Sequence, residues 1–112
     1  MGRGEAMTEQ QIQKILTFLG FAARSKNLVF GKDMLREYIT DPGIAKKIVI
    51  IARDTGDRVK RDLKIRCQMN NVKYLELFEK AELSKAIGKE SISAVGISDE
   101  NLVDGILKLL SE

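Results

Sequence analysis

Gly31, Lys32 and Asp33 form the first group of residues whose types and order could do chemistry. A glycine and a lysine at the start of a helix place free backbone N–H groups beside a positive side chain, and these can hold an anion. A Walker loop also needs a glycine five positions before the Gly-Lys pair and Ser or Thr after the lysine, whereas this chain has Lys26 and Asp33 there. The alternatives are an ordinary glycine turn and a site for a phosphate of RNA or of a nucleotide.

Two carboxylates and one thiol are the other candidates for chemistry. Asp54 and Asp57 follow an apolar run at the end where α/β sheets place ligands, but such residues more often cap the next helix than form a catalytic pair. Cys67 is the only Cys and lies on an apolar helical stripe, which indicates a buried small hydrophobe. The absence of His excludes Ser-His-Asp triads, Cys-His pairs and His-ligated metals. We therefore expect no catalytic residue, no metal site and no cofactor.

The elements that must position these residues belong to a chain of 112 residues, 44% hydrophobic and 31% charged, which is the balance of a soluble globular protein. We expect residues 1–7 to form a flexible tail or an expression remnant and residues 8–112 to form a single domain. No apolar run approaches the length of a membrane span, and no signal-peptide core is present, so we expect a cytoplasmic protein.

Hydrophobic periodicity predicts five helices alternating with four strands. The unbroken β-branched run at residues 48–52 predicts a central strand covered on both faces, as in a mostly parallel sheet. In the strand at residues 72–78 either Val72 and Tyr74 or Leu75 and Leu77 face inward. The alternation predicts an α/β fold, a three-layer α/β/α sandwich with a four-stranded mixed sheet.

Residue types near the expected helix ends also predict how the helices begin and end. The helix at about residues 55–70 is expected to bury Val59, Leu63 and Cys67, which lie at i, i+4 and i+8. The expected caps, in chain order, are Thr8 with Gln11, Thr55 or Asp57, Gly88, and Ser98.

The net charge of +3 conceals an uneven distribution. Residues 24–36 carry a net +3 and residues 46–73 a net +6, whereas residues 79–112 carry four Lys against seven carboxylates. On the helix at about residues 55–70 the favoured interpretation is a solvated face, with Lys60 and Lys64 interacting with neighbouring Asp side chains. The charges at residues 24–36 flank a glycine turn and indicate a basic face for a polyanion.

Three segments of the chain carry a resemblance to a known family: residues 23–31 (ARSKNLVFG), 48–54 (IVIIARD) and 82–89 (ELSKAIGK). They resemble the ribosomal protein superfamily of L7Ae and L30e, and most of all its small bacterial members. The resemblance covers about residues 8–110. It implies a three-layer fold that binds kink-turn RNA, a sharply bent internal loop with tandem sheared G·A pairs, and it implies no catalysis.

The same resemblance implies where RNA would be bound. In the family, the turn matching Gly31 and the start of the next helix enter the major-groove side of the G·A pairs. The loop matching residues 87–89 meets nucleotides splayed from the bend, where an apolar Ile87 beside a slim Gly88 could pack on an unstacked base. The expected RNA-binding residues are Lys26, Gly31, Lys32, Asp33, Arg36, Arg53, Lys85, Ile87, Gly88 and Lys89.

The chain departs from the family's strong binders, which carry glycine, a small residue, asparagine, glutamate and, three positions further, lysine. Asp33 can only accept hydrogen bonds when ionised, and Met34 offers none to a guanine. Glu37 stands at the lysine position and would repel a phosphate, although Arg36 lies one position away. We therefore expect binding to a kink-turn or related structured RNA, ribosomal RNA among the candidates, with an affinity or target unlike the standard one. The alternative is a protein-interaction adaptor with the same fold.

Overall fold

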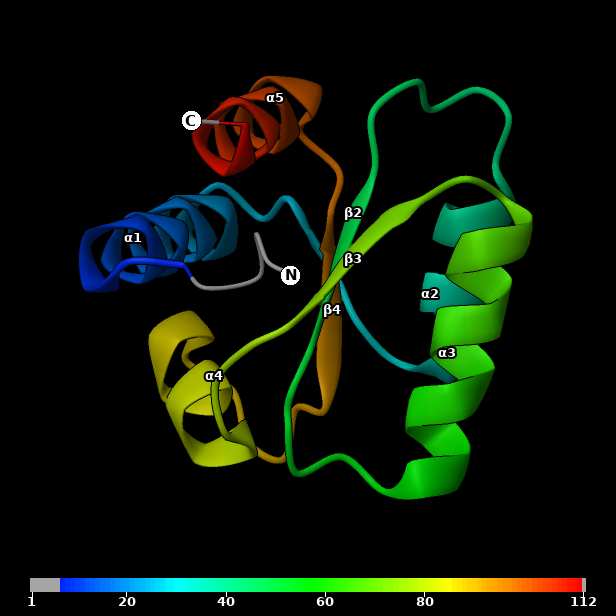
Figure 1. Ribbon diagram of the computed structural model, residues 1–112, viewed down its shortest axis with the longest axis horizontal. Coiled ribbons are helices and arrows are strands. Elements are labelled where there is room, and N and C mark those ends of the chain that lie inside the picture. The colour runs from blue at the N-terminus through cyan, green and yellow to red at the C-terminus, as the bar shows by residue number, and fades with distance from the viewer. Residues whose placement is uncertain (1–6, 112) are drawn as a thin grey trace.

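The computed structural model describes residues 7–111, within which five helices and four strands alternate along the chain (Figure 1). The observed elements are α1 Glu9–Arg24, β1 Leu28–Val29, α2 Lys32–Thr40, β2 Ile48–Ile51, α3 Asp57–Met69, β3 Lys73–Glu76, α4 Lys80–Ile87, β4 Ala94–Ile97 and α5 Glu100–Leu110. This is the predicted α/β fold with a four-stranded mixed sheet. The tail expected at residues 1–7 lies outside the described residues, except for Met7, which packs partly buried against the core.

The sheet has the strand order β1-β4-β2-β3. Strands β2 and β3 are parallel, with Ile48 opposite Lys73, because α3 connects them as a crossover. Strand β4 is antiparallel to both of its neighbours, β1 and β2. The expectation of a mostly parallel sheet around residues 48–52 is therefore wrong. Strand β2 is interior and buried throughout, but its burial comes from helices on both faces and not from the direction of its neighbours.

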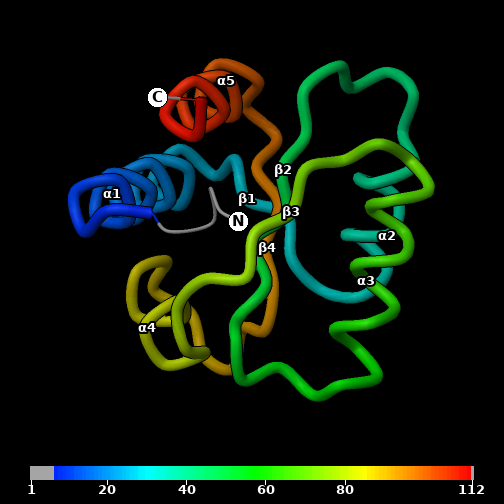
Figure 2. The backbone as a smooth tube through the Cα atoms, viewed as in Figure 1, coloured from blue at the N-terminus to red at the C-terminus, as the bar shows by residue number. Residues whose placement is uncertain are grey.

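Helices cover both faces of the sheet (Figure 1). We call α1, α4 and α5 the three-helix layer, and α2 and α3, which pack on the other face, the two-helix layer. Figure 2 shows the backbone passing from one layer to the other through β1, which leads from α1 into α2. Side chains of β2 alternate between the layers: Ile48 and Ile50 join the core of the three-helix layer, and Val49 and Ile51 that of the two-helix layer.

Both sets of side chains that were candidates to face inward from the third strand are packed against helices, one set on each face of the sheet. Val72 and Tyr74 pack in the core of the two-helix layer, whereas Leu75 and Leu77 pack in that of the three-helix layer. The segment is apolar on both faces because each face meets a layer of helices.

Tyr38 of α2 joins the two interior strands. Its hydroxyl accepts the backbone N–H of Ile48 at 2.9 Å and donates to the carbonyl of Ile97 at 2.7 Å. Burial raises the pKa of the Tyr38 hydroxyl, and these two backbone contacts partly oppose that shift. The ring lies against Gly96, where an added Cβ would stand 2.6 Å from it, so this position of β4 requires a residue without a Cβ.

Two of the predicted caps are confirmed. The Thr8 side chain accepts the backbone N–H of Gln11, and the Gln11 side chain accepts that of Thr8, which forms the capping box of α1. Gly88 ends α4 in the left-handed conformation, with φ of 71°.

Two other caps differ from the prediction. Gly56, rather than Thr55 or Asp57, is the N-cap of α3. Thr55 is buried and its hydroxyl donates to the carbonyl of Ser93 at 3.1 Å, so it joins the end of β2 to the segment before β4. At α5 the predicted Ser98 gives way to Asp99, whose carboxylate accepts two backbone N–H groups of the first turn.

Candidate nucleic-acid interface

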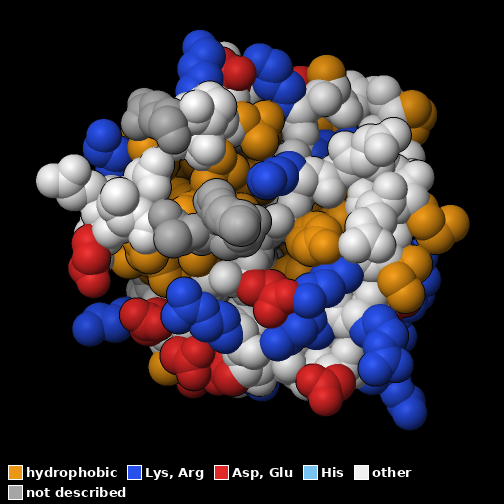
Figure 3. Space-filling model, viewed as in Figure 1, with side chains coloured by type: hydrophobic (Ala, Val, Ile, Leu, Met, Phe, Trp, Pro, Cys, Tyr) orange, Lys and Arg blue, Asp and Glu red, His pale blue; other side chains and the backbone are white. Residues whose placement is uncertain are grey.

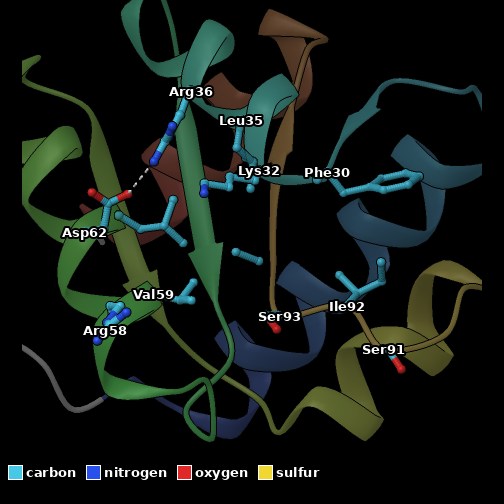
Figure 4. Close-up of a pocket in the computed structure, with 13 residues that line it drawn as sticks. Phe30, Lys32, Leu35, Arg36, Arg58, Val59, Asp62, Ser91, Ile92 and Ser93 are labelled. Atoms are coloured by element: carbon cyan, nitrogen blue, oxygen red, sulfur yellow. Dashed lines mark ion pairs between the residues drawn. The ribbon is translucent and has the colours of Figure 1, made fainter.

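A groove of about 490 Å³ opens between α2, α3 and the segment that leads into β4 (Figure 4). Its lining side chains come from three parts of the chain, within residues 30–36, 58–63 and 91–94. The groove therefore lies at the edge of the two-helix layer, beside the carboxyl end of β2 and the amino end of β4.

The glycine turn forms one end of the groove. Gly31 has φ of 90° and ψ of 146°, a conformation that favours glycine, and it is the N-cap of α2 without a side-chain cap. The first backbone hydrogen bond of α2 runs from the N–H of Leu35 to the carbonyl of Gly31, so earlier N–H groups have no partner within the helix. These groups and the helix dipole favour a negative charge here, although the exposed Asp33 of the first turn partly offsets that preference.

Three cations and one carboxylate line the groove. Lys32 and Arg58 are exposed, and Arg36 is half-buried. Asp62 of α3 lies opposite Arg36, with 3.8 Å between Arg36 Nη2 and Asp62 Oδ2, as the dashed line in Figure 4 shows. The groove thus carries net positive charge and suits a polyanion.

Apolar side chains form the walls between these charges. Val59 is 51% exposed, and Phe30 and Ile92 are partly buried. The prediction that Val59 lies on the buried face of its helix is therefore wrong, whereas Leu63 and Cys67 of the same stripe are buried as expected. Val59 differs because the first turn of α3 borders the groove, while the later turns pack on the sheet.

The loop after α4 closes the other side of the groove. The hydroxyl of the buried Ser84 accepts the backbone N–H of Ile92 at 3.0 Å, which holds the loop against α4. Lys89 Nζ lies 5.6 Å from the centroid of the Phe30 ring, a cation–π contact. This contact brings the loop after Gly88 beside the glycine turn, although the two are far apart in the sequence.

The structure brings some of the expected RNA-binding residues together and separates others. Gly31, Lys32 and Arg36 line the groove, and Lys89 lies beside it. Lys26 stands at the opposite end of β1, because Leu28 pairs with Ile97 at the carboxyl end of β4.

Arg53 and Lys85 are exposed but do not line the groove. Arg53 follows β2 at the groove's edge of the sheet, and its carbonyl accepts the Lys60 ammonium at 2.6 Å. Lys85 lies in the last turn of α4.

Ile87 differs most from its expected place. The sequence places it at the surface for contact with a base, whereas its side chain is 5% exposed and packs in the core of the three-helix layer. It ends the apolar face of α4, and Gly88 then turns the chain away. The partly exposed apolar side chains that do line the groove are Phe30, Val59 and Ile92, none of which we expected to contact RNA.

The acidic residues and the cysteine have structural surroundings. Asp54 Oδ1 accepts the backbone N–H of Lys80 at 2.8 Å, so Asp54 satisfies the first N–H of α4, whose N-cap is Glu79, and does not cap α3. Asp57 is the first residue of α3 and is exposed. Cys67 is fully buried, as predicted, and burial raises the pKa of its thiol to about 11.

Ion pairs balance much of the positive charge on α3. Lys60 and Lys64 both pair with Glu76 of β3, rather than with the Asp neighbours that the sequence indicated. The hydrogen bond from Lys64 lowers the pKa of the Glu76 carboxyl. Figure 3 likewise shows Lys and Arg side chains intermixed with Asp and Glu on the face it presents. The basic groove is therefore a local feature and not part of a uniformly basic helix.

Among residues 7–111, no group of three or more His, Cys, Asp or Glu side chains could hold a metal ion. In the same part of the chain, no helix is both long and apolar enough to cross a lipid bilayer.

The fold and the groove define the class of protein: an α/β sandwich whose basic, apolar-walled groove lies between a glycine turn and a second loop. A sequence profile of the ribosomal protein L7Ae/L30e/S12e/Gadd45 family matches residues 13–104. The chain belongs to this family, as the sequence motifs predict.

Individual relatives are similar over most of their length. The RNA-binding protein YlxQ of Enterococcus faecium is 31% identical over 74% of this chain and 79% of its own, and that of Bacillus subtilis (strain 168) is 26% identical over 82% and 90%. A protein of unknown function from Bacillus halodurans has a TM-score of 0.77 at 26% identity, covering 88% of this chain and 98% of its own. The 15.5kD RNA binding protein of Giardia lamblia shares the fold, with a TM-score of 0.73 at 19% identity over 94% of this chain and 88% of its own.

Proposed function

We propose that this protein binds structured RNA, and that its target is a kink-turn or a related bent internal loop, ribosomal RNA included. The observation that carries the proposal is the groove, which combines unpaired helix N–H groups, three cations and apolar walls between two loops. Membership of the family and the similarity to proteins named RNA-binding protein YlxQ support it.

The groove provides two kinds of contact that a bent RNA needs. The N–H groups of the first turn of α2, together with Lys32, neutralise phosphates that the bend crowds together. Val59 and Ile92 offer an apolar surface to a base that the bend has unstacked, which is the role we expected of Ile87. Lys89 meets the RNA from the second loop. Recognition of this kind depends on the shape of the RNA more than on its sequence.

Three residues of α2 distinguish this site from the family's strong binders. Asp33, Met34 and Glu37 are all exposed on α2 but do not line the groove, so they meet an RNA that extends past the turn over the rest of the helix surface. Two of them are negative, and none replaces the hydrogen bonds of asparagine and glutamate at their positions. We infer a target or an affinity different from that of a standard kink-turn reader. We also infer a cytoplasmic, non-catalytic protein that needs no cofactor.

The test is titration of the protein with a kink-turn RNA and with a plain duplex at two salt concentrations, by gel shift or calorimetry. We expect tighter binding to the kink-turn. Lys32→Ala and Lys89→Ala should each weaken binding and lower the slope of log K against log salt by about one unit. Lys14→Ala on α1, an exposed lysine outside the groove, is the matched control and should leave both quantities unchanged. Failure to bind either RNA would contradict the proposal.

Copurification separates RNA binding from the adaptor alternative. If the protein binds RNA in the cell, it should carry nucleic acid that absorbs at 260 nm and that nuclease removes. A stoichiometric protein partner without nucleic acid would instead favour a protein-interaction adaptor.

A further inference from the structure

Arg36 has hydrogen-bond donors that nothing in the described part of the chain uses. Its Nε is buried and has no hydrogen-bond partner there. Its Nη2 lies 3.8 Å from Asp62 Oδ2, which is an ion pair but is too long for a hydrogen bond. Figure 4 shows Arg36 reaching from α2 across the groove toward α3. Nε is too enclosed to reach a ligand, but the Arg36 side chain is 37% exposed, so its Nη groups are held near Asp62 by charge and remain free to donate to a ligand.

Asp62 is itself held in place. The same Oδ2 atom accepts a hydrogen bond from Arg66 Nε at 3.1 Å, one helical turn further along α3. The Asp62 side chain is 44% exposed, and this bond restrains its rotamer on the side of α3 that borders the groove. Among the described residues that line the groove, it is the only carboxylate, beside the three cations Lys32, Arg36 and Arg58.

We propose that Asp62, anchored by Arg66, is a positioning and specificity-determining residue for RNA binding. It holds Arg36 extended across the groove, so that the free donors of Arg36 meet a phosphate or a base edge of an RNA that fits the groove. Its own negative charge repels the backbone of an RNA that only touches the surface. This inference rests on the proposed function, because it assigns how the same groove selects one shape of RNA over another.

The energetic argument combines two opposing effects. A carboxylate lowers the affinity of a groove for any polyanion, so it would not aid a site that bound RNA by charge alone. A guanidinium loses conformational freedom when it binds, and an ion pair that already fixes its direction reduces that loss. Asp62 therefore weakens binding to all RNA a little and favours the RNA that reaches Arg36.

The decisive variant is Asp62→Asn, which keeps the shape of the side chain and removes its charge. We expect duplex affinity to rise and kink-turn affinity to fall, so that the ratio of the two affinities drops by about fivefold, about the net contribution of one ordinary hydrogen bond. The matched control is Asp104→Asn on α5, because Asp104 also pairs with two cations, Lys46 and Lys108, but lies outside the groove. It changes the net charge equally and should leave the ratio unchanged. An unchanged ratio in Asp62→Asn would overturn the proposal.

A double-mutant cycle separates positioning from a simple charge effect. If Asp62 acts through Arg36, the loss of kink-turn affinity on Asp62→Asn should disappear in an Arg36→Gln background. If the two changes add independently, Asp62 does not position Arg36 and the proposal is wrong.

A measurement without RNA keeps this inference distinct from the proposed function. The Nε–H proton of Arg36 should exchange slowly with solvent, because Nε is buried, and its NMR signal should be visible in the wild-type protein and in Asp104→Asn. In Asp62→Asn we expect faster exchange and loss of the signal. A signal that persists unchanged overturns the positioning role even if RNA binds. A wild-type protein that binds no RNA contradicts the proposed function, and with it the selectivity role of Asp62.

Discussion

The two helix layers pack on opposite faces of the same sheet but differ in how completely they cover it. The three-helix layer covers its face with apolar side chains such as Ile15, Leu19 and Ile106, which are all fully buried. The two-helix layer has a smaller core, in which Tyr38 and Cys67 replace some of the aliphatic residues. At the edge of this layer, the groove remains open between α2, α3 and the segment before β4. One face of the sheet thus carries the larger apolar core, whereas the other borders the candidate groove.

The first prediction concerns the three-helix layer. Leu19→Ala should lower the free energy of unfolding by about 3 kcal/mol, because Leu19 is fully buried and its removal leaves a cavity. Urea denaturation measures this loss. The RNA affinity of the folded protein should not change. As a control, Ile65→Ala on α3, where Ile65 is 46% exposed, should cost under about 1 kcal/mol. Similar losses in the two variants would contradict the comparison between the layers.

The second prediction concerns the junction between α2 and the sheet. Tyr38→Phe should lower the free energy of unfolding by about 2 kcal/mol, because it leaves the N–H of Ile48 and the carbonyl of Ile97 without their partner. Thermal or urea unfolding gives the value. Tyr74→Phe is the matched control, since its hydroxyl accepts only an exposed bond from Gln68 and its loss should have little effect. Equal effects would show that the Tyr38 hydroxyl does not fasten the strands.

The third prediction is a pH dependence that arises in the two-helix layer. Burial raises the pKa of the Cys67 thiol to about 11, above its ordinary value of 9.0, so the folded protein retains a proton that the unfolded chain loses between these values. The contribution is complete below pH 9 and is lost as the pH rises toward 11. At pH 10 this should lower the free energy of unfolding by about 1 kcal/mol relative to pH 8. Urea titrations at both pH values should show a smaller decrease for Cys67→Ala than for the wild type, and identical decreases would disprove the coupling.

The fourth prediction concerns the groove and has the smallest effect. Val59→Ala should change the free energy of unfolding by less than about 0.5 kcal/mol, because the side chain is 51% exposed. It should weaken binding of a kink-turn RNA by about threefold, through the loss of apolar contact with an unstacked base. Calorimetric titration measures the affinity, with Ile65→Ala as the control outside the groove. If binding is weakened equally by both variants, Val59 does not contact the RNA.

The sequence predicted the succession of elements because each one has its own local signal. The capping box at Thr8 and the left-handed Gly88 are examples, since both depend on residues within one or two turns of the chain. Strand order has no such signal. Strand β4 pairs with β1 and β2 in an antiparallel sense, and only the packing of whole layers decides that arrangement. The cap at Asp99 shows the limit of local rules, because Ser98 and Asp99 are adjacent and both can cap a helix.

The candidate site was predictable on one side only. Gly31 and Lys32 are found from their positions before a helix, but Asp62 is recognised only when α2 and α3 are placed next to each other. The side chain of Arg58 resembles any other exposed cation on its helix. Ser91 and Ser93 also line the groove, but serines are common in loops and indicate no function by themselves. The prediction that Ile87 contacts a base was wrong because the last apolar residue of a helix can point either into the core or toward solvent, and the sequence does not distinguish the two.

The interior position of β4 has a consequence for how the protein is made. Strand β4 is the last strand to leave the ribosome, yet it lies between β1 and β2 and supplies the interior hydrogen bonds of both. A nascent chain that ends before Ala94 has β2 and β3 to pair but nothing to join β1 to them. The four-stranded sheet can therefore close only after β4 has left the ribosome, so folding of this domain is delayed until Ala94–Ile97 is available to pair.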